Sequence, residues 1–285
     1  GGTISGFYSG GYSTVSPLYH NIIDKFAFSS NVTATDHGDL TIGRLMPSGS
    51  SSATHGYIGG GSTASTPSAS IDKYAFASAG NATSHGNLST SHGYTSGQSS
   101  STHGFTSGGN SSNIVIDKFA FASNVTGTNH GSLVNFVSRM SGHSSYTDGY
   151  TGGGVAPQQT LINKFSFASS GNATDHGDLT VSRGSSGGSS STTHGYTAGG
   201  EPATNVIDRF AYGSGANSTD HGDLSSGRSG NERIGGGGVS SVTHGFTGGG
   251  IISNIIDKFS FASNTTAADF GDLSFTRRQP AGTQY

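Results

Sequence analysis

The segment Ile23-Asp24-Lys25-Phe26-Ala27-Phe28 occurs six times, with small changes, in this chain of 285 residues. The intervals between successive copies are 48, 45, 46, 45 and 49 residues. A fixed period of about 20–50 residues is typical of repeat architectures such as solenoids and propellers. The copies are centred on Asp24, Asp72, Asp117, Asn163, Asp208 and Asp257.

A second repeated segment, His-Gly-Tyr/Phe-x-x-Gly-Gly, indicates how the repeats are closed. The chain continues for 39 residues after the last copy's aromatic residue, Phe246, and 7 residues lead to the first, Phe7. Together these pieces make 46 residues, which is one repeat, so residues 3–11 supply a strand that the C-terminal unit lacks. The ends of a solenoid stay apart, whereas a ring needs such a match. The aromatic residues are Phe7, Tyr57, Phe105, Tyr150, Tyr196 and Phe246.

Each repeat reads as strands rather than helices. Phe26 and Phe28 share one face of an extended segment, and the flanking Gly, Ser, Thr and Asn residues favour turns. A Ser/Gly-rich connection leaves room for a fourth short strand. We therefore predict a single all-β domain over residues 1–285, a six-bladed β-propeller with four-stranded blades, closed by the N-terminal strand pairing with the C-terminal blade. The aromatic stripe is expected to pack between blades.

The composition limits the classes of function. The net charge is −3 and no basic block is present, so we expect no nucleic-acid partner. No apolar run approaches the roughly 18 residues of a membrane helix, so no membrane insertion is expected. The chain has no Cys, which removes thiolate metal sites and cysteine nucleophiles. We expect no cofactor and no metal.

The repeat resembles the kelch family, the propellers that include the galactose-oxidase-like domains. The matching features are Tyr196 followed by Gly199-Gly200, the next strand with Asp208, and Arg183 before the aromatic residue. The resemblance covers the whole chain and implies the propeller fold. The family's outer-strand Trp is missing, since the chain has no Trp, and three leucines are expected to fill that space: Leu40, Leu179 and Leu224.

An acidic and a basic residue are adjacent in most repeats. Neighbours in a strand point to opposite faces, so each basic side chain could reach an acid on the next blade and form a ring of ion pairs. The alternative is a solvated charge worth about 0–1 kcal/mol. We favour the first interpretation slightly. These structural repeat pairs are Asp24-Lys25, Asp72-Lys73, Asp117-Lys118, Asp208-Arg209 and Asp257-Lys258.

Three further motifs have two interpretations each. The Thr-Asp-His-Gly-Asp-Leu segments, as at Asp36 to Asp39, could bind a metal, but backbone turn chemistry is favoured. Asn-x-Ser/Thr recurs once per unit and reads either as a glycosylation site or, as we favour, as a turn. The histidines that precede Gly-aromatic could line one mouth of the channel or be buried and hydrogen-bonded, the second being favoured. They are His55, His103, His194 and His244, with Asp148 in the same register.

The carboxylates argue against an enzyme. Of 16 acidic residues, only Asp148, Glu201 and Glu232 are unique to one unit. An active site needs a general acid and a general base in different environments, and residues repeated around a ring are better explained by the scaffold. We therefore expect no catalytic residues.

The predicted function is a non-catalytic binding or adhesion module. It would recognise a glycan or receptor on an extracellular or virion surface, such as a phage tail. A purely structural ring that contacts other subunits of a larger assembly is the alternative, and a carbohydrate-active enzyme is less favoured. A ligand site is expected where the repeat is broken, because symmetric positions are constrained by packing. Its candidate residues are Asp148, Tyr146, Tyr150, Glu201 and Glu232.

Overall fold

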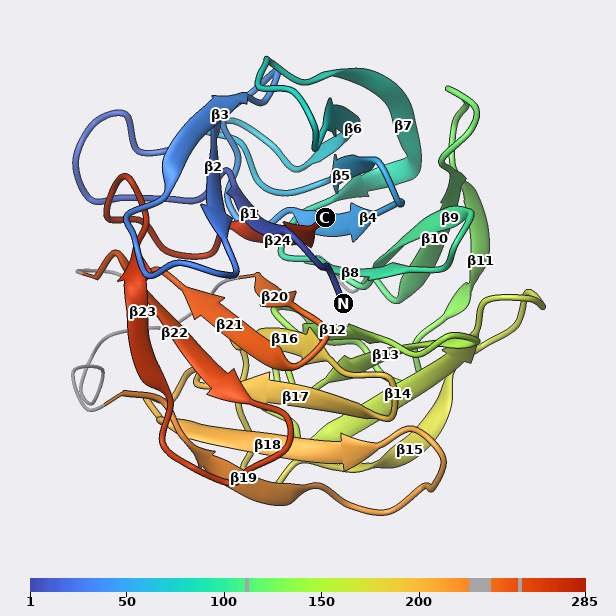
Figure 1. The fold of residues 1–285 in the computed structure, drawn as a ribbon. Helices are drawn as coiled ribbons and strands as arrows, with labels where there is room; N and C mark the ends of the chain where they lie inside the picture. Colours follow the sequence, from blue (N-terminus) through green and yellow to red (C-terminus); the bar gives the residue numbers. More distant parts are fainter. Residues whose placement is uncertain (111–112, 226–236, 251–252) are drawn as a thin grey trace.

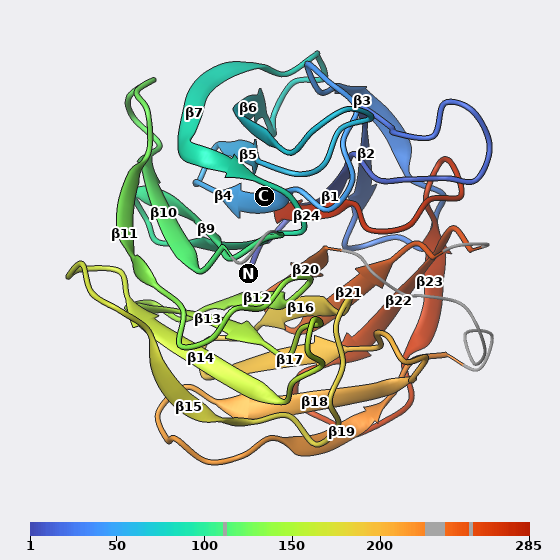
Figure 2. The same cartoon turned by 180° about the vertical axis from the view of Figure 1, so that it is seen from behind.

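The computed structural model describes residues 1–110, 113–225, 237–250 and 253–285. In these residues six four-stranded antiparallel sheets are arranged around a common axis, as Figures 1 and 2 show from opposite sides. The predicted fold, a six-bladed β-propeller with four-stranded blades, is confirmed. Within the described ranges no helix is long and apolar enough to cross a membrane.

The strands of each blade follow one another from the axis to the periphery. Blade 1 contains β24 (Ala281–Gln284), β1 (Ser5–Ser9), β2 (Ile22–Ala27) and β3 (Thr35–Asp39). Blade 2 contains β4 (Ser48–Ser51), β5 (His55–Gly59), β6 (Ser68–Ala75) and β7 (Thr83–His92). Blade 3 contains β8 (Ser96–Ser99), β9 (His103–Ser107), β10 (Val115–Ala120) and β11 (Thr128–Ser132).

The other three blades repeat this order. Blade 4 contains β12 (Ser141–Ser144), β13 (Asp148–Gly152), β14 (Leu161–Ser166) and β15 (Thr174–Asp178). Blade 5 contains β16 (Gly187–Ser190), β17 (His194–Ala198), β18 (Val206–Ala211) and β19 (Thr219–Asp223). Blade 6 contains β20 (Gly238–Ser240), β21 (His244–Gly248), β22 (Ile255–Ser260) and β23 (Ala268–Asp272).

Blade 1 closes the ring with strands from both ends of the chain. The C-terminal strand β24 is its innermost strand, and the N-terminal strand β1 pairs with β24 on one side and β2 on the other. Phe7 lies opposite Thr283 and Lys25. The closure by N-terminal strand pairing is confirmed, with three strands from the N-terminal end and one from the C-terminal end.

Aromatic residues form the seams between consecutive blades. Tyr57 of blade 2 stacks on Phe121 of blade 3 with ring centroids 4.5 Å apart, and its hydroxyl donates to the Phe121 carbonyl oxygen. Phe26 of blade 1 is buried and contacts Phe246 of blade 6. The expected inter-blade packing of the aromatic stripe is therefore observed. The three leucines at the position of the missing Trp are buried: Leu40, Leu179 and Leu224.

We name the two faces of the ring, the turn face and the loop face, after the chain segments that connect the strands there. The turn face carries the short turns between the first and second strands, at residues 52–54, 100–102, 145–147, 191–193 and 241–243. The loop face lies at the opposite ends of the same strands. It carries the longer connections between second and third strands, such as residues 60–67 and 153–160.

Candidate functional site

The innermost strands meet so closely around the axis that the same position in every blade is glycine, the second residue of five of these strands and the first of the shorter β20. A Cβ atom on Gly97 would collide with the carbonyl oxygen of Gly49, and one on Gly142 with that of Gly97. Each carbonyl therefore points along the ring and fills the space of the neighbour's missing side chain. The six glycines are Gly49, Gly97, Gly142, Gly188, Gly238 and Gly282.

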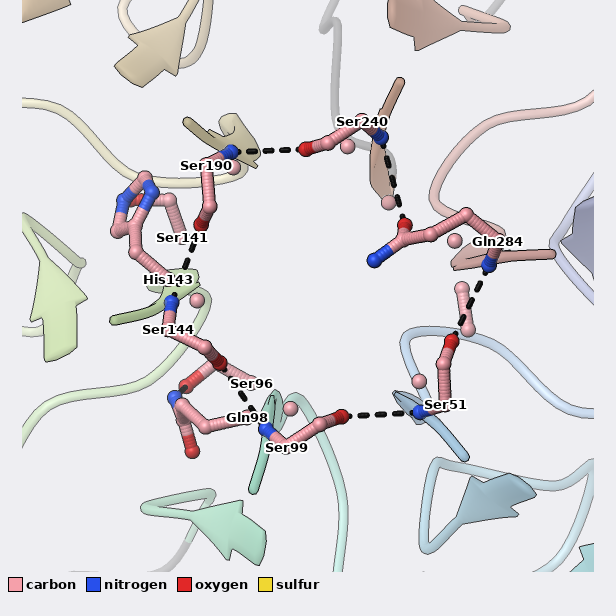
Figure 3. A pocket seen from close by; sticks show the side chains of 18 of the residues that line it. Ser51, Ser96, Gln98, Ser99, Ser141, His143, Ser144, Ser190, Ser240 and Gln284 are labelled. Atoms are coloured by element: carbon pink, nitrogen blue, oxygen red, sulfur yellow. Dashed lines mark hydrogen bonds between the residues drawn. The ribbon is translucent and has the colours of Figure 1, made fainter. Parts of the chain in front are cut away.

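The last residue of each innermost strand belongs to a closed circle of hydrogen bonds, which we call the polar ring (Figure 3). The amide of Ser51 donates to the Ser99 Oγ atom at 2.9 Å, and the amide of Ser99 donates to the Ser144 Oγ atom at 3.0 Å. The unpaired amides of an exposed strand edge can hydrogen-bond to a strand of another molecule. In this ring, side-chain oxygens of the neighbouring blades accept those amides instead. The polar ring consists of Ser51, Ser99, Ser144, Ser190, Ser240 and Gln284.

A cavity of about 380 Å³ occupies the axis. Its wall is formed by the ring glycines and the polar ring, so it presents hydroxyl, amide and backbone groups. Met46, Met140 and Gln279 line its end at the loop face, and Tyr146 lines its end at the turn face. The volume falls within the roughly 300–1,000 Å³ of small-molecule sites.

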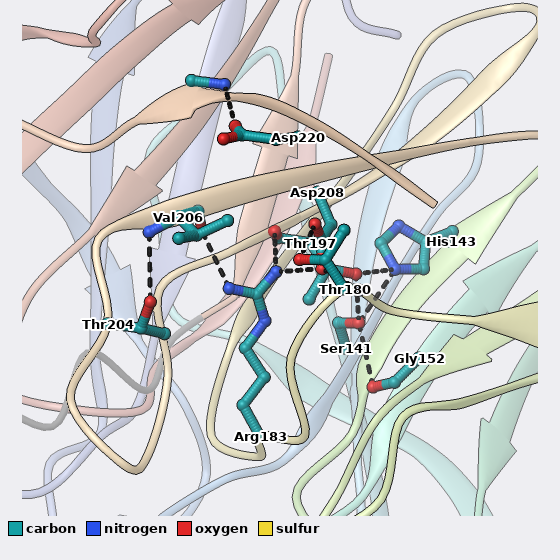
Figure 4. A network of polar contacts seen from close by, with 11 residues as sticks. Ser141, His143, Gly152, Thr180, Arg183, Thr197, Thr204, Val206, Asp208 and Asp220 are labelled. Carbon is teal, nitrogen blue, oxygen red and sulfur yellow. Dashed lines mark hydrogen bonds and ion pairs between the residues drawn. The ribbon is translucent and has the colours of Figure 1, made fainter. Parts of the chain in front are cut away.

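The wall also contains the imidazole of His143, which is turned between blades 4 and 5 (Figures 3 and 4). Its Nδ1 lies 3.0 Å from the Ser189 carbonyl oxygen, so that nitrogen carries the proton. Its Nε2 lies 3.0 Å from the Thr197 hydroxyl and accepts from it, while the Ser141 hydroxyl, 2.9 Å away, donates to the Gly152 carbonyl oxygen. Burial lowers the pKa of His143 to about 4, so the ring is neutral at pH 7 and the cavity wall carries no side-chain charge.

The structure separates the predicted ligand-binding residues. Tyr146 is 92% exposed in the β12–β13 turn at the mouth of the cavity, two residues from Asp148, which lies 3.5 Å from Lys164. Tyr150 is fully buried in the core, where its hydroxyl donates to the Tyr212 carbonyl oxygen. Glu201 lies on the opposite, loop face, 3.5 Å from Arg139. Glu232 lies outside the described residues.

The repeated aspartates have a different cation from the one the sequence suggests. In the seam between blades 4 and 5, the buried Arg183 donates to Asp208, and Thr180 donates to the same carboxylate (Figure 4). Arg44 with Asp72 and Arg277 with Asp24 repeat this ion pair. The expectation of Lys–Asp pairs between blades is thus wrong for these seams. We call this Arg–Asp arrangement the seam clamp.

The adjacent lysines lie over aromatic rings of their own blade. Lys73 is 5.8 Å from the ring centroid of Tyr57, and Lys118 is 6.0 Å from that of Phe105. The neighbouring strand places each lysine opposite its aromatic residue, as Lys73 lies opposite Tyr57. A cation above a ring face is attracted by its quadrupole. The basic residues therefore contact aromatic rings of their own blade, and Lys25 also donates to the Phe76 carbonyl oxygen of the next blade at 3.4 Å.

The histidines that precede Gly-aromatic do not line the cavity. Each begins the second strand of its blade, and its Nδ1 contacts the hydroxyl of the preceding threonine at 2.8 Å. Burial, and then the nearby Lys or Arg, lowers the pKa of all four. Of the favoured interpretation, a buried and hydrogen-bonded histidine, the hydrogen bond is observed, but the four side chains are only half-buried. They are His55, His103, His194 and His244.

The Thr-Asp-His-Gly-Asp segments hold neighbouring blades together. The Nε2 of His37 in blade 1 contacts the Ala75 carbonyl oxygen of blade 2 at 2.8 Å, while Asp36 accepts the amide of Gly38. The exposed Asn81 accepts the amide of Asp39 across the same seam. Among the described residues no group of three His, Cys, Asp or Glu side chains could hold a metal ion. The backbone interpretation of these two motifs is supported.

Two features of the site escaped the sequence analysis. The short Gly-x-Ser pattern of the innermost strands is hard to distinguish in a Ser/Gly-rich chain, although its spacing matches the repeat. The sequence does contain a signal for the seam clamp. An arginine at the connection position occurs together with an aspartate on the following blade, whereas the uncharged Val137 occurs together with the uncharged Asn163. No protein-family model matches the sequence, and no curated protein is significantly similar to it.

Proposed function

We propose that this propeller is a non-catalytic module that binds a glycan at the turn-face mouth of its axial cavity. The observation that carries the proposal is Tyr146, a 92%-exposed aromatic side chain at the mouth of a cavity with a hydroxyl-rich wall. Sugars are bound by aromatic faces that stack on their C–H groups and by polar groups that pair with their hydroxyls. The proposed location is an extracellular or virion surface.

Tyr146 also breaks the sixfold pattern, which supports a specialised role. The equivalent position of the other described turns holds a smaller side chain, as with Ala53, Ser101 and Thr192. Because the side chain of Tyr146 is exposed, it contributes little to the packing of the propeller. The stability of the fold therefore does not explain why a tyrosine occupies this position. Tyr150, in contrast, is explained by the core.

The non-catalytic part of the proposal is supported by what the carboxylates do. Asp24, Asp72 and Asp208 are fully buried in seam clamps. Asp36 and Asp175 accept backbone amides of their own outer strands. These acids already have structural partners, whereas catalytic acids and bases must exchange protons with a substrate.

We further propose a kelch-like relationship for the repeat. The seam clamp supports it, because Arg183 binds the Thr197 carbonyl oxygen just after the conserved-position aromatic residue Tyr196, as well as Asp208. These are the Arg, aromatic and Asp positions on which the resemblance rests.

The proposal is tested on a glycan array with purified protein and a matched pair of variants. Wild type is expected to bind a defined set of glycans, and Tyr146→Ala to weaken that binding about tenfold, the upper range of one aromatic contact. Ser101→Ala changes the same turn position in the preceding blade, at a residue that does not line the cavity, and serves as the control, with binding unchanged. Tyr146→Phe should retain binding, since the ring face remains.

Three results would contradict the proposal in whole or in part. Wild type that binds no glycan favours the alternative, a structural ring within a larger assembly. Binding that survives Tyr146→Ala unchanged moves the site away from this mouth. Hydrolysis of a bound glycan by wild type would overturn the non-catalytic assignment.

A further inference from the structure

We infer that the polar ring binds a carboxylate, so that the glycan recognised at this mouth is an acidic sugar. This inference rests on the proposed function, because it concerns the same cavity, and it adds the chemical class of the ligand. Three properties of the site carry it: free hydrogen-bond donors, few competing acceptors, and a basic residue in every blade around it.

The donors come from the hydroxyl groups of the polar ring. The Oγ atoms of Ser51, Ser99 and Ser144 each accept one backbone amide, and among the described residues no acceptor lies in place for their own protons. Serines elsewhere in the same strands do have one, since Ser48 donates to the Gly59 carbonyl oxygen. The three protons are therefore available to a ligand in the cavity.

Gln284 adds a carboxamide donor to the same ring. Its Oε1 atom accepts the amide of Ser240, which fixes the orientation of the side chain. Its Nε2 atom then points into the centre of the ring in Figure 3. Gln284 is the only member of the polar ring that is not serine, so it also breaks the symmetry of the wall. The NH₂ group of Gln284 and the serine hydroxyls of the polar ring therefore offer several hydrogen-bond donors to one ligand.

Competing acceptors are turned away from the axis. The carbonyl oxygens of the ring glycines approach the Cα atoms of neighbouring glycines, as Gly49 approaches Gly97 and Gly97 approaches Gly142. Such oxygens form Cα–H···O contacts within the wall. A ligand therefore meets donors more readily than acceptors, and a carboxylate, which only accepts, complements that wall.

Basic side chains encircle the cavity at the turn face, where the acidic Asp148 lies 3.5 Å from one of them, Lys164. A basic residue occupies the same position on the third strand of every blade, and its charge lowers the pKa of the nearby histidine, as Lys73 does for His55 and Lys118 for His103. The repeated aspartates of the outermost strands are farther from the axis. The basic residues are Lys25, Lys73, Lys118, Lys164, Arg209 and Lys258.

Tyr146 lies where it can hold the sugar while the ring holds the acid. It follows Ser144, a member of the polar ring, by two residues, and both line the cavity. A sugar ring stacked on the tyrosine would place a carboxylate substituent toward the donors. Sugar recognition and acid recognition thus depend on different residues, which can be changed separately.

The first experiment tests the acid part alone, by NMR titration of the full chain with acetate and with its neutral isostere acetamide. Acetate is expected to shift signals of the polar ring and to bind at least tenfold more tightly than acetamide. Gln284→Glu replaces the carboxamide donor by an isosteric carboxylate and should remove this preference. Gln158→Glu makes the same change at an exposed site on the loop face and should leave it intact.

The second experiment uses methyl β-glucuronide and methyl β-glucoside, which differ in a carboxylate. Wild type is expected to bind the glucuronide at least tenfold more tightly, and Gln284→Glu to reduce the two affinities to within about twofold of each other. Ser144→Ala removes one donor without adding charge and should lower the glucuronide affinity severalfold. It keeps the test valid if the glutamate variant fails to fold.

The outcomes separate the two proposals. Equal binding of both probes, lost in Tyr146→Ala, overturns the acidic-sugar inference and leaves glycan binding standing. A glucuronide preference that survives in folded Gln284→Glu places the acid site elsewhere and also overturns the inference. Acetate binding without any glycan binding supports the donor ring and contradicts the proposed function.

Discussion

The seam between blades 4 and 5 contains a buried ion pair, whereas the seam between blades 3 and 4 contains no charge at the same positions. Arg183 and Asp208 of the first seam are replaced by Val137 and Asn163 in the second, and all four side chains are buried. Both members of the pair have changed together. The comparison indicates that the aspartate is tolerated in the seam only with its cation.

One interaction is common to both seams. The amide of Thr180 donates to the Asp208 Oδ2 atom at 3.0 Å, and the amide of Val134 donates to the Asn163 Oδ1 atom at 3.0 Å. In each case the donor is the chain leaving the previous blade. The essential role of this position is therefore to accept that amide. The guanidinium is needed when the acceptor carries a charge.

A third seam adopts an intermediate solution. His92 replaces the arginine between blades 2 and 3, and its Nε2 lies 2.9 Å from Asp117. Both side chains are fully buried. The chain thus contains three natural versions of one seam, with Arg–Asp, His–Asp and Val–Asn, and each can be imposed on another by substitution.

The largest effect is expected from Arg183→Met, which keeps most of the volume but leaves Asp208 buried without its cation. Removing one member of a buried pair typically costs about 3–5 kcal/mol. Urea unfolding followed by circular dichroism measures the loss. Arg183→Met combined with Asp208→Asn reproduces the uncharged seam and should recover at least half of it. Equal losses in the single and double variants would contradict the interpretation of the pair as one unit.

The reverse change, Asn163→Asp, places a carboxylate in the uncharged seam. We expect about 3 kcal/mol of destabilisation at pH 8, because Val137 offers no charge and the acid has lost its solvation. Desolvation raises the pKa of such an acid in the folded state, so the folded state binds the extra proton and the loss shrinks as the pH falls. The difference in unfolding free energy from wild type, measured at pH 8 and at pH 5, checks this. If the Asn163→Asp variant were less stable relative to wild type at pH 5 than at pH 8, the introduced carboxylate would not have a raised pKa and the prediction would be wrong.

The ring and its closure were predictable from the sequence because repetition and chain length determine them together. The spacing of the Phe7 series and the missing strand of the last unit require a closed sixfold arrangement, whichever residues fill the seams. Side-chain partners were harder to infer. Adjacency along the chain suggested Lys73 as the partner of an aspartate, whereas the actual cation, Arg44, precedes Asp72 by 28 residues in a connection between blades.

The candidate site shows the same limit. Tyr146 and Asp148 were identified because they depart from the repeat, and exposure of Tyr146 agrees with the principle that tolerant surface turns can specialise. The polar ring was missed because its members follow the repeat, so that no departure marks them. The circle of hydrogen bonds forms only because six innermost strands meet at the axis. The sequence of one repeat does not reveal contacts between different repeats.

A smaller effect is expected at the seam between blades 4 and 5 from the titration of His143. Its pKa of about 4 in the folded protein lies below the ordinary value of 6.5, so the unfolded chain binds more protons between these values. Stability is therefore fully present above about pH 6.5 and falls as the pH drops toward 4. One pKa unit corresponds to about 1.4 kcal/mol, which gives a loss of about 2 kcal/mol between pH 7 and pH 5.

His143→Gln isolates this contribution. Gln98 occupies the same strand position in blade 3, so a glutamine fits the inner strand of a neighbouring blade. Other histidines with lowered pKa values, such as His55, remain in both proteins. The variant should lose about 2 kcal/mol less than wild type between pH 7 and pH 5. Parallel pH profiles for the two proteins would show that His143 does not titrate in this way.

The smallest effect concerns the lysine next to each seam position, and it distinguishes the two assignments of that residue. If Lys73 acted on Asp117 of the next blade, its removal would cost more than removal of Lys118, whose counterpart in the next blade is the neutral Asn163. In the structure the ammonium groups of Lys73 and Lys118 lie 5.8 and 6.0 Å from the aromatic ring centroids of Tyr57 and Phe105. We therefore expect Lys73→Met and Lys118→Met to cost similar amounts, about 0.5–1 kcal/mol each. A loss at Lys73 that exceeds the loss at Lys118 by more than about 1 kcal/mol, measured by urea unfolding, would instead favour an ion pair across the seam.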